Sequence, residues 1–252
     1  MAVTIIRDSG VVASSTSTAT AAVSFAALPA AGNQIIASVG IYGTSAPGTI
    51  SASDNQGGSS YSVAATTTNG LNKAGAAVLY RENISSPSGT FTVTFADGGT
   101  SIQWSGVIAY EVSGLPASAS LDKTTVNSDV GCGSVTSFTP TASAALRSSD
   151  GVAFLADGSG CNTENLNPVT VAPSFTVNGA DFDSANSNYS VSNKILTSSA
   201  SVAPVINWTG TSNAFDTIAT VLAVFDAGAD LPPINYKEFP KNPIRSRAQG
   251  IA

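Results

Sequence analysis

The chain has 252 residues, of which 10 are Lys or Arg, 16 are Asp or Glu and none is His, so its formal net charge is −6. A chain of this length buries roughly 70–75% of its unfolded surface and needs neither a metal nor a disulfide to fold. The absence of His removes the commonest general base and the commonest metal ligand, and a composition rich in Ser, Thr, Ala and Gly argues against long amphipathic helices.

The chain starts with "MAVTIIRDSGVV", which has no basic segment and no long apolar core. We therefore expect no secretory signal. No apolar run approaches the ~20 residues that a membrane-spanning helix needs. The expectation is a soluble protein made in the cytoplasm, with no membrane partner.

Strand-like runs follow one another along the chain, at residues 34–42, 76–83, 91–95, 104–112, 151–156 and 215–225. In "FTVTF", Phe91, Val93 and Phe95 fall on one face and the two threonines on the other, as in a strand with one wet face. Turn clusters such as "SDNQGGSS" and "SSPSG" separate the runs. No window has a helical period, so the sequence predicts an all-β fold.

The two halves of the body resemble each other faintly. "VIAYEVSG" at residues 107–114 is echoed by "VLAVFDAG" at residues 221–228, and "NQIIASVG" has a weaker counterpart in "DGVAFLADG". We interpret this as one β-sandwich domain over residues 1–230, built from half-sandwiches at about 1–128 and 129–230 that share a core. The alternative is coincidence between valine-rich strands.

One succession of motifs carries a family resemblance: "SDNQGGSSYSV" from residue 53, then "AAVLYRENI", "GTFTVTF", "VIAYEVSGL" and "LDKT". It resembles a group of bacterial and bacteriophage β-sandwich modules, similar to jelly-roll and lectin-like sandwiches, that occur in secreted surface proteins and virion proteins. The match covers residues 1–130 well and 131–230 loosely. The matching positions are Asp54, Gly57, Tyr61, Asn83, Ile84, Glu111, Ser113, Gly114 and Leu115. The resemblance implies an antiparallel, jelly-roll-like β-sandwich and an extracellular or virion setting, without implying a reaction.

Two cysteines, Cys132 and Cys161, lie in glycine-rich surroundings at a spacing that matches no zinc pattern. Our functional interpretation is a disulfide that forms after release into an oxidising medium. The alternative is two unpaired small residues in turns.

The best metal candidate is "GADFDSANSNYS" at residues 179–190, which offers closely spaced oxygen donors to calcium. Its spacing departs from an EF-hand loop, and the same residue types populate ordinary turns. A plain loop is therefore the favoured interpretation, and we expect no cofactor. The candidate ligands are Asp181, Asp183, Asn186 and Asn188.

The last 22 residues, 231–252, differ from the rest of the chain. They hold four basic side chains, one acidic side chain and four prolines, whereas residues 1–230 hold six basic and fifteen acidic side chains. A segment with a net charge of +3 thus follows a body with a net charge of −9. The prolines exclude a regular helix or a central strand. We expect an extended arm along a neighbouring surface, the alternative being a mobile tail. The residues expected to contact a partner are Leu231, Pro232, Pro233, Ile234, Tyr236, Lys237, Phe239, Lys241, Ile244, Arg245 and Arg247.

These features predict a non-enzymatic bacteriophage virion protein, a capsid decoration or cement protein that its arm anchors to the major capsid protein or to neighbouring copies. We expect a homo-oligomer that reaches the medium by host lysis. The acidic body argues against nucleic acid as a partner. One alternative is a carbohydrate-binding or adhesive module that contacts a host-surface glycan. A second is a glycan-degrading enzyme, which would need two acids about 5–10 Å apart in a cleft; the sequence contains no serine-hydrolase or phosphate-loop motif.

Overall fold

The computed structural model describes residues 2–13, 18–43, 47–57, 60–68, 74–98, 102–133, 137–161, 169–181, 188–208 and 215–228. Every element in this part of the chain is a β-strand, and every strand pairing is antiparallel. The all-β prediction is therefore confirmed. The described residues include no helix that could cross a membrane.

The first eight strands form what we call the N-terminal lobe. Sheet A has the order β1-β8-β3-β6-β5, and sheet B has the order β2-β7-β4. The bounds are β1 Thr4–Asp8, β2 Thr20–Ser24, β3 Gln34–Gly43, β4 Ile50–Asp54, β5 Ser62–Thr68, β6 Ala74–Arg81, β7 Thr92–Asp97 and β8 Ile102–Ser113.

The next eight strands form the C-terminal lobe. Sheet C has the order β13-β14-β11-β16-β9, and sheet D has the order β10-β15-β12. The bounds are β9 Leu121–Gly133, β10 Ser137–Phe138, β11 Gly151–Cys161, β12 Thr170–Ala172, β13 Thr176–Asp181, β14 Asn188–Leu196, β15 Val205–Asn207 and β16 Phe215–Asp226.

The two lobes have the same topology. Each strand of the N-terminal lobe has its counterpart eight strands later. Adding eight to every strand number converts the order of sheet A into that of sheet C, read from the opposite edge, and the order of sheet B into that of sheet D. Within a lobe the first strand pairs with the last, the second with the seventh and the third with the sixth. This is the pairing of a jelly roll, with the fifth strand added to the edge of the larger sheet.

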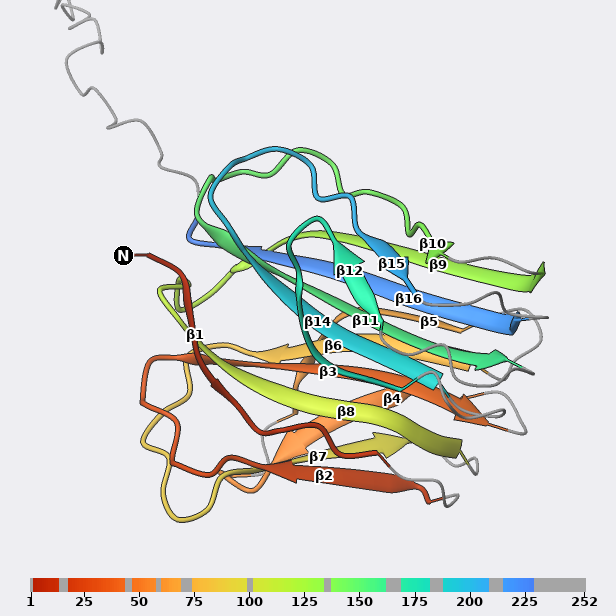
Figure 1. Cartoon of the computed structure of the whole chain (residues 1–252). Coiled ribbons are helices and arrows are strands. Elements are labelled where there is room, and N and C mark those ends of the chain that lie inside the picture. Colours follow the sequence, from red (N-terminus) through yellow and green to blue (C-terminus); the bar gives the residue numbers. More distant parts are fainter. Residues whose placement is uncertain are drawn as a thin grey trace, which may run out of the picture.

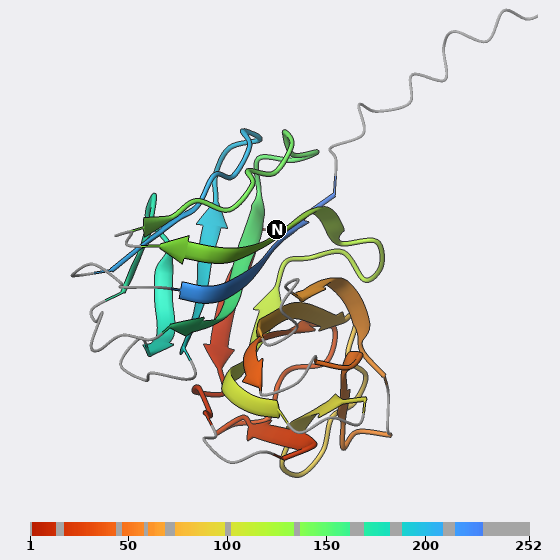
Figure 2. The same cartoon turned by 90° about the vertical axis from the view of Figure 1, so that its right-hand side faces the viewer.

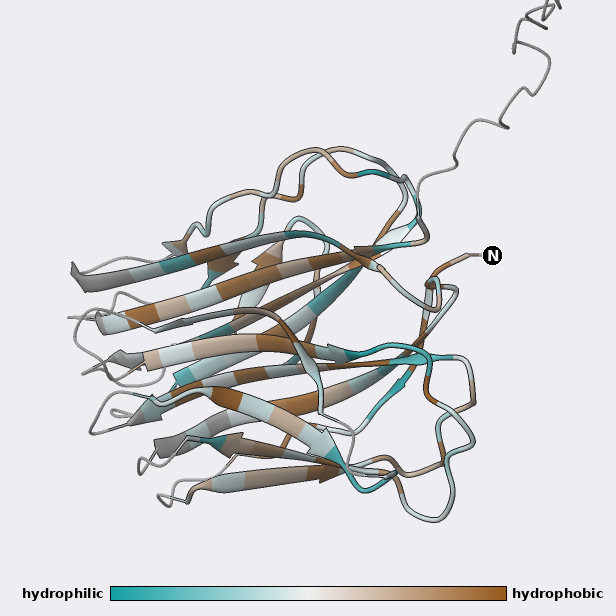
Figure 3. Cartoon of the chain, turned by 180° about the vertical axis from the view of Figure 1, so that it is seen from behind, coloured by the Kyte–Doolittle hydropathy of each residue, from teal (hydrophilic) through white to brown (hydrophobic). Residues whose placement is uncertain are grey.

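The four sheets stack as layers in the order B, A, C, D (Figure 1), and the turned view separates the two lobes (Figure 2). One apolar core lies between B and A, a second between A and C, and a third between C and D. Sheets A and C are therefore covered on both faces. This explains the uninterrupted apolar runs within β3, β8, β11 and β16, such as residues 152–156 in β11. Brown, hydrophobic segments occur along the strands in Figure 3. By contrast, β7 of the outer sheet B alternates as predicted: Val93 and Phe95 are buried, as is Phe91 directly before the strand.

The two inner sheets approach closely where β3 faces β11. A Cβ atom added to Gly40 would lie 2.0 Å from the carbonyl oxygen of Asp157. A Cβ atom added to Gly158 would lie 2.4 Å from the carbonyl oxygen of Gly75 and 2.5 Å from that of Ile41. Glycine is required here because the backbones leave no room for a side chain.

The faint sequence echo between the lobes is shifted by one residue relative to the structure. It pairs Val107 with Val221, but Val107 packs in the core between sheets A and B, whereas Val221 packs in the core between A and C. Aligning β8 and β16 end to end instead pairs Ile108 with Val221, and both then face the same core. In a strand, a one-residue shift moves every side chain to the opposite face.

Candidate functional site

The predicted arm, residues 231–252, lies outside the described residues, which end at Gly228. The partner contacts assigned to its side chains therefore stay a prediction. The structure does describe the segment that precedes these residues in the chain, at the end of β16.

The two cysteines lie near the ends of β9 and β11. Both strands pair with β16, where Phe215 is the register partner of Gly133 on one side and of Cys161 on the other. Because β16 lies between β9 and β11, two inter-strand spacings of about 4.8 Å each separate these strands. Bridged Cα atoms are at most about 7 Å apart, so a disulfide between Cys132 and Cys161 would require the ends of β9 and β11 to come together beyond the start of β16. Their side chains lie outside the described part, and the disulfide stays a prediction.

The calcium candidate is only partly described. Asp181 is the last residue of β13 and Asn188 is the first residue of β14, whose side chain is buried. Asp183 and Asn186 fall in residues 182–187, outside the described residues. Within the described residues, no group of three or more His, Cys, Asp or Glu could hold a metal ion. The calcium loop thus stays untested.

Aromatic side chains can stack on sugars, but those described next pack mainly in the cores. Trp104 and Tyr110 are fully buried, and Trp208 is almost so. The indole nitrogen of Trp104 donates a hydrogen bond to the carbonyl oxygen of Thr18 at 2.9 Å. Tyr80 is half-buried and packs edge-on against Phe225, with ring centroids 5.3 Å apart.

The last described residues, 226–228, form what we call the arm root. The Asp226 carboxylate accepts a hydrogen bond from the backbone amide of Gly228 at 3.0 Å and an ion-paired one from Arg147 Nη2 at 3.0 Å. Gly228 has a positive φ of 85°, which glycine adopts without strain. The amide of Ala227 donates to the carbonyl oxygen of Asp150 at 2.9 Å. Hydrogen bonds and an ion pair therefore hold the last described residues to the body.

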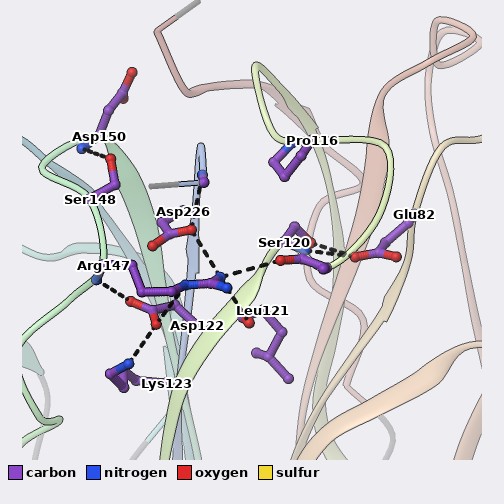
Figure 4. Close-up of polar contacts among 12 residues, drawn as sticks. Glu82, Pro116, Ser120, Leu121, Asp122, Lys123, Arg147, Ser148, Asp150 and Asp226 are labelled. Atoms are coloured by element: carbon purple, nitrogen blue, oxygen red, sulfur yellow. Dashed lines mark hydrogen bonds and ion pairs between the residues drawn. The ribbon is translucent and has the colours of Figure 1, made fainter. Parts of the chain in front are cut away.

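Arg147 is the centre of this network (Figure 4). Its Nε contacts Asp122 Oδ1 at 3.0 Å, and its backbone amide donates to Asp122 Oδ2 at 2.9 Å. Its Nη2 also donates to the carbonyl oxygens of Leu121 and Ala119, at 3.1 and 3.2 Å. Lys123 Nζ adds a second cation, 2.6 Å from Asp122 Oδ1. Arg147 thus joins the start of β9 to the end of β16.

The pKa values of the two carboxylates in this network, Asp122 and Asp226, are shifted in opposite directions. Burial acts to raise the pKa of Asp122, but hydrogen bonds from Lys123 and from the Arg147 amide, with both positive charges, outweigh it and hold that pKa below its ordinary value. Burial also acts on Asp226, where it outweighs the Gly228 amide and Arg147, so its pKa lies above its ordinary value. Asp122 is therefore the stably charged partner of Arg147.

Replacing Arg147 by methionine is expected to destabilise the protein by about 2 kcal/mol, because the buried carboxylate of Asp226 loses its ion-pair partner and that of Asp122 keeps only Lys123. The value is at the low end for a buried ion pair because the Arg147 side chain is 38% exposed. Urea unfolding at pH 7 would measure it. The double variant R147M/D226N should recover part of the loss, and an R147M protein as stable as the wild type would contradict the assignment.

A polar cleft of about 470 Å³ lies on the N-terminal lobe between residues 55–57 and 85–90. Asn55 Nδ2 donates to the carbonyl oxygen of Thr90 at 2.7 Å, and its Oδ1 accepts from the amide of Thr92 at 3.0 Å. Gln56 makes the same pair of bonds with the backbone of Ser88, at 2.9 and 2.8 Å. Two side-chain amides thus hold the loop in place, and the cleft presents neutral hydroxyl and amide groups.

Sequence reasoning missed the arm root and this cleft. The only local signal for the arm root is the "DAG" that follows β16, an Asp two residues before a Gly, which is typical of a side-chain-capped turn. Arg147 lies 79 residues away from Asp226, so no spacing motif could connect them.

Comparison with protein-family models, with curated proteins and with solved structures found no match to this chain. The resemblance to bacteriophage and bacterial surface modules therefore rests on the strand and turn motifs alone.

Proposed function

We propose that this protein is a non-enzymatic structural protein that joins a larger assembly through its C-terminal arm. The observation that carries this proposal is the charge contrast: a segment with a net charge of +3 follows a body with a net charge of −9. The arm root, which directly precedes this segment, is held in place by Asp226 and Arg147. An arm with a fixed point of departure adds contact surface without rearranging the body. An interface of standard size buries about 1,600 Å², and 22 extended residues could supply much of it.

In its specific form, the proposal is a bacteriophage capsid decoration or cement protein whose neighbours are other virion subunits. The support is the motif resemblance together with the jelly-roll-like sandwich that it implied. Host lysis would account for an extracellular setting. Homo-oligomerisation belongs to the same proposal.

Deleting residues 231–252 is expected to leave a folded, soluble body that no longer joins its particle. Binding to purified particles would be measured by co-sedimentation, and folding by the thermal unfolding midpoint. A matched variant in which Lys237, Lys241, Arg245 and Arg247 become glutamine tests whether charge or apolar contact dominates. Full occupancy of particles by the truncated protein would contradict the arm proposal.

Mass spectrometry of purified virions, with copy number measured against the major capsid protein, tests the virion setting. Hundreds of copies would indicate decoration, a few would indicate a tail or fibre, and none would overturn the virion proposal.

The cleft beside Asn55 and Gln56 favours a second candidate, a carbohydrate-binding module. Neutral amides and hydroxyls are groups that hydrogen-bond to sugars, and side-chain and backbone bonds hold them rigidly. A glycan-degrading activity has less support, because neither this cleft nor a second one of about 430 Å³ beside residues 47–49 and 66–68 is lined by a carboxylate. Glycan-array binding that an N55A/Q56A variant loses would favour this second candidate.

A further inference from the structure

The face of sheet C that points away from sheet A carries a buried polar patch. Six polar side chains on three adjacent strands share this face, and none is more than 1% exposed. Their strand neighbours Ala156, Tyr189 and Val221 point the other way, into the core between sheets A and C. The members of the sheet C polar patch are Asp157 and Ser159 on β11, Asn188, Ser190 and Ser192 on β14, and Thr220 on β16.

Several oxygen atoms of this patch have no hydrogen-bond partner. Asp157 lies between its register partners Ser190 and Thr220. The hydroxyl of Ser190 donates to Asp157 Oδ1, but Oδ2 has no partner. The hydroxyl oxygens of Ser159, Ser192 and Thr220 are also buried without one. Buried polar atoms are nearly always satisfied in folded proteins, so this concentration requires an explanation.

The N-terminal lobe provides an internal comparison. When β8 and β16 are aligned end to end, the row Ser190, Asp157, Thr220 corresponds to the row Ala77, Val39, Val107 in sheet A. All three N-terminal residues belong to the apolar core between sheets A and B. The same topology is thus built with an apolar face in one lobe, and the polar face of the other is not a requirement of the fold.

Within the patch, the carboxylate of Asp157 has the largest free-energy cost of burial. Burial raises its pKa to about 7, against the opposing effect of the hydrogen bonds from Ser190. The described side chains that face it from β14 and β16 are Ser190, Ser192, Asn188 and Thr220, none of which is charged. A buried charge without a counter-charge is strongly disfavoured, so either a proton or a cation must neutralise it.

We propose that the sheet C polar patch binds a hard metal cation through Asp157 Oδ2 and the hydroxyl oxygens of Thr220 and Ser159. Oxygen atoms are the ligands that hard cations prefer. Thr220 is the direct cross-strand neighbour of Asp157, at a usual Cβ separation of about 4.5–5.5 Å, and Ser159 is the next residue on the same face of β11. The single negative charge balances a monovalent ion, which makes Na⁺ the best-matched candidate.

The test compares thermal unfolding midpoints of the metal-free full chain at pH 8 in NaCl, KCl, CaCl₂ and choline chloride at equal ionic strength. A metal salt that binds is expected to raise the midpoint by about 3–6 °C over choline when its concentration is well above the dissociation constant. The D157N variant should show no such rise. The T220V variant, which copies Val107 of the other lobe, should need about tenfold more salt for half of the effect, since it loses one ligand.

A matched control is S38A, which removes another buried, unpartnered hydroxyl on sheet A, outside the patch; it should respond to salt like the wild type. A D183N variant separates the patch from the calcium loop predicted from the sequence. Equal midpoints in all four salts, or a salt response that survives D157N and disappears in D183N, would overturn the proposal.

Discussion

Gly158→Ala is expected to destabilise the protein by at least about 3 kcal/mol, and G40A by as much, because each added methyl group would meet backbone atoms of the facing sheet. The new Cβ at residue 158 would lie 2.4–2.6 Å from backbone atoms of Gly75 and Ile41. Backbone atoms cannot rotate away as a side chain would, so the sheets must separate and lose contacts across the whole core between A and C. For a chain of this size the expected fall in the unfolding midpoint is about 6–12 °C.

Gly10→Ala is the matched control for this prediction. Gly10 is exposed, has a positive φ of 72° and has nothing within 4 Å of an added Cβ. Its replacement should cost only the backbone strain, about 1 kcal/mol. If G158A were no less stable than G10A, the two inner sheets would not be as close as the structure places them.

Phe154→Ala is expected to cost about 3–5 kcal/mol, because it removes the central ring of the core between the lobes. The Phe154 ring centroid lies 4.8 Å from that of Tyr110 and 6.1 Å from that of Phe225, and Phe225 in turn packs against Tyr80. The four rings come from β11, β8, β16 and β6, two from each lobe. Aromatic pairs in such geometries add to the stabilisation from burial alone.

The same variant tests whether the lobes unfold together. With a shared core, urea should unfold the wild type and F154A in a single transition, with the midpoint of F154A lowered. F175A is the matched control, since Phe175 belongs to the core between sheets C and D and leaves the inter-lobe core intact. Two separate transitions in the wild type would show that the contact between lobes is too weak to couple them.

Several elements could be predicted from sequence because their patterns are local. The runs that became β3, β6, β7, β8, β11 and β16 are rich in β-branched and aromatic residues and are bounded by turn clusters. Two long strands were missed, β9 with "LDKTTVNSDVGCG" and β14 with "NYSVSNKIL". β9 is an edge strand of sheet C. β14 supplies Asn188, Ser190 and Ser192 to the buried polar patch, so its sequence looks like that of a loop.

The candidate sites also divide into those that a local sequence pattern predicts and those that it does not. The basic, proline-rich character of residues 231–252 was visible in the sequence because charge and proline content are properties of a segment. The Arg147 network and the Asp157 patch were not visible, because each joins residues that are distant in the chain. Asp157 stands in the run "GVAFLADGSGC", where it reads as the first residue of a turn after a strand, whereas β11 continues to Cys161.

The amino-acid sequence by itself determined the all-β class, the positions of six of the sixteen described strands and the segregation of positive charge at the C-terminal end, since these follow from alternation, turn chemistry and composition. Only the tertiary structure decided which strands pair, that two jelly-roll lobes stack as four layers, and which side chains face which core. The physical reason is that strand register and facing depend on packing between distant segments. A shift of one residue, such as that between Val107 and Val221, leaves the sequence pattern almost unchanged but exchanges the buried faces.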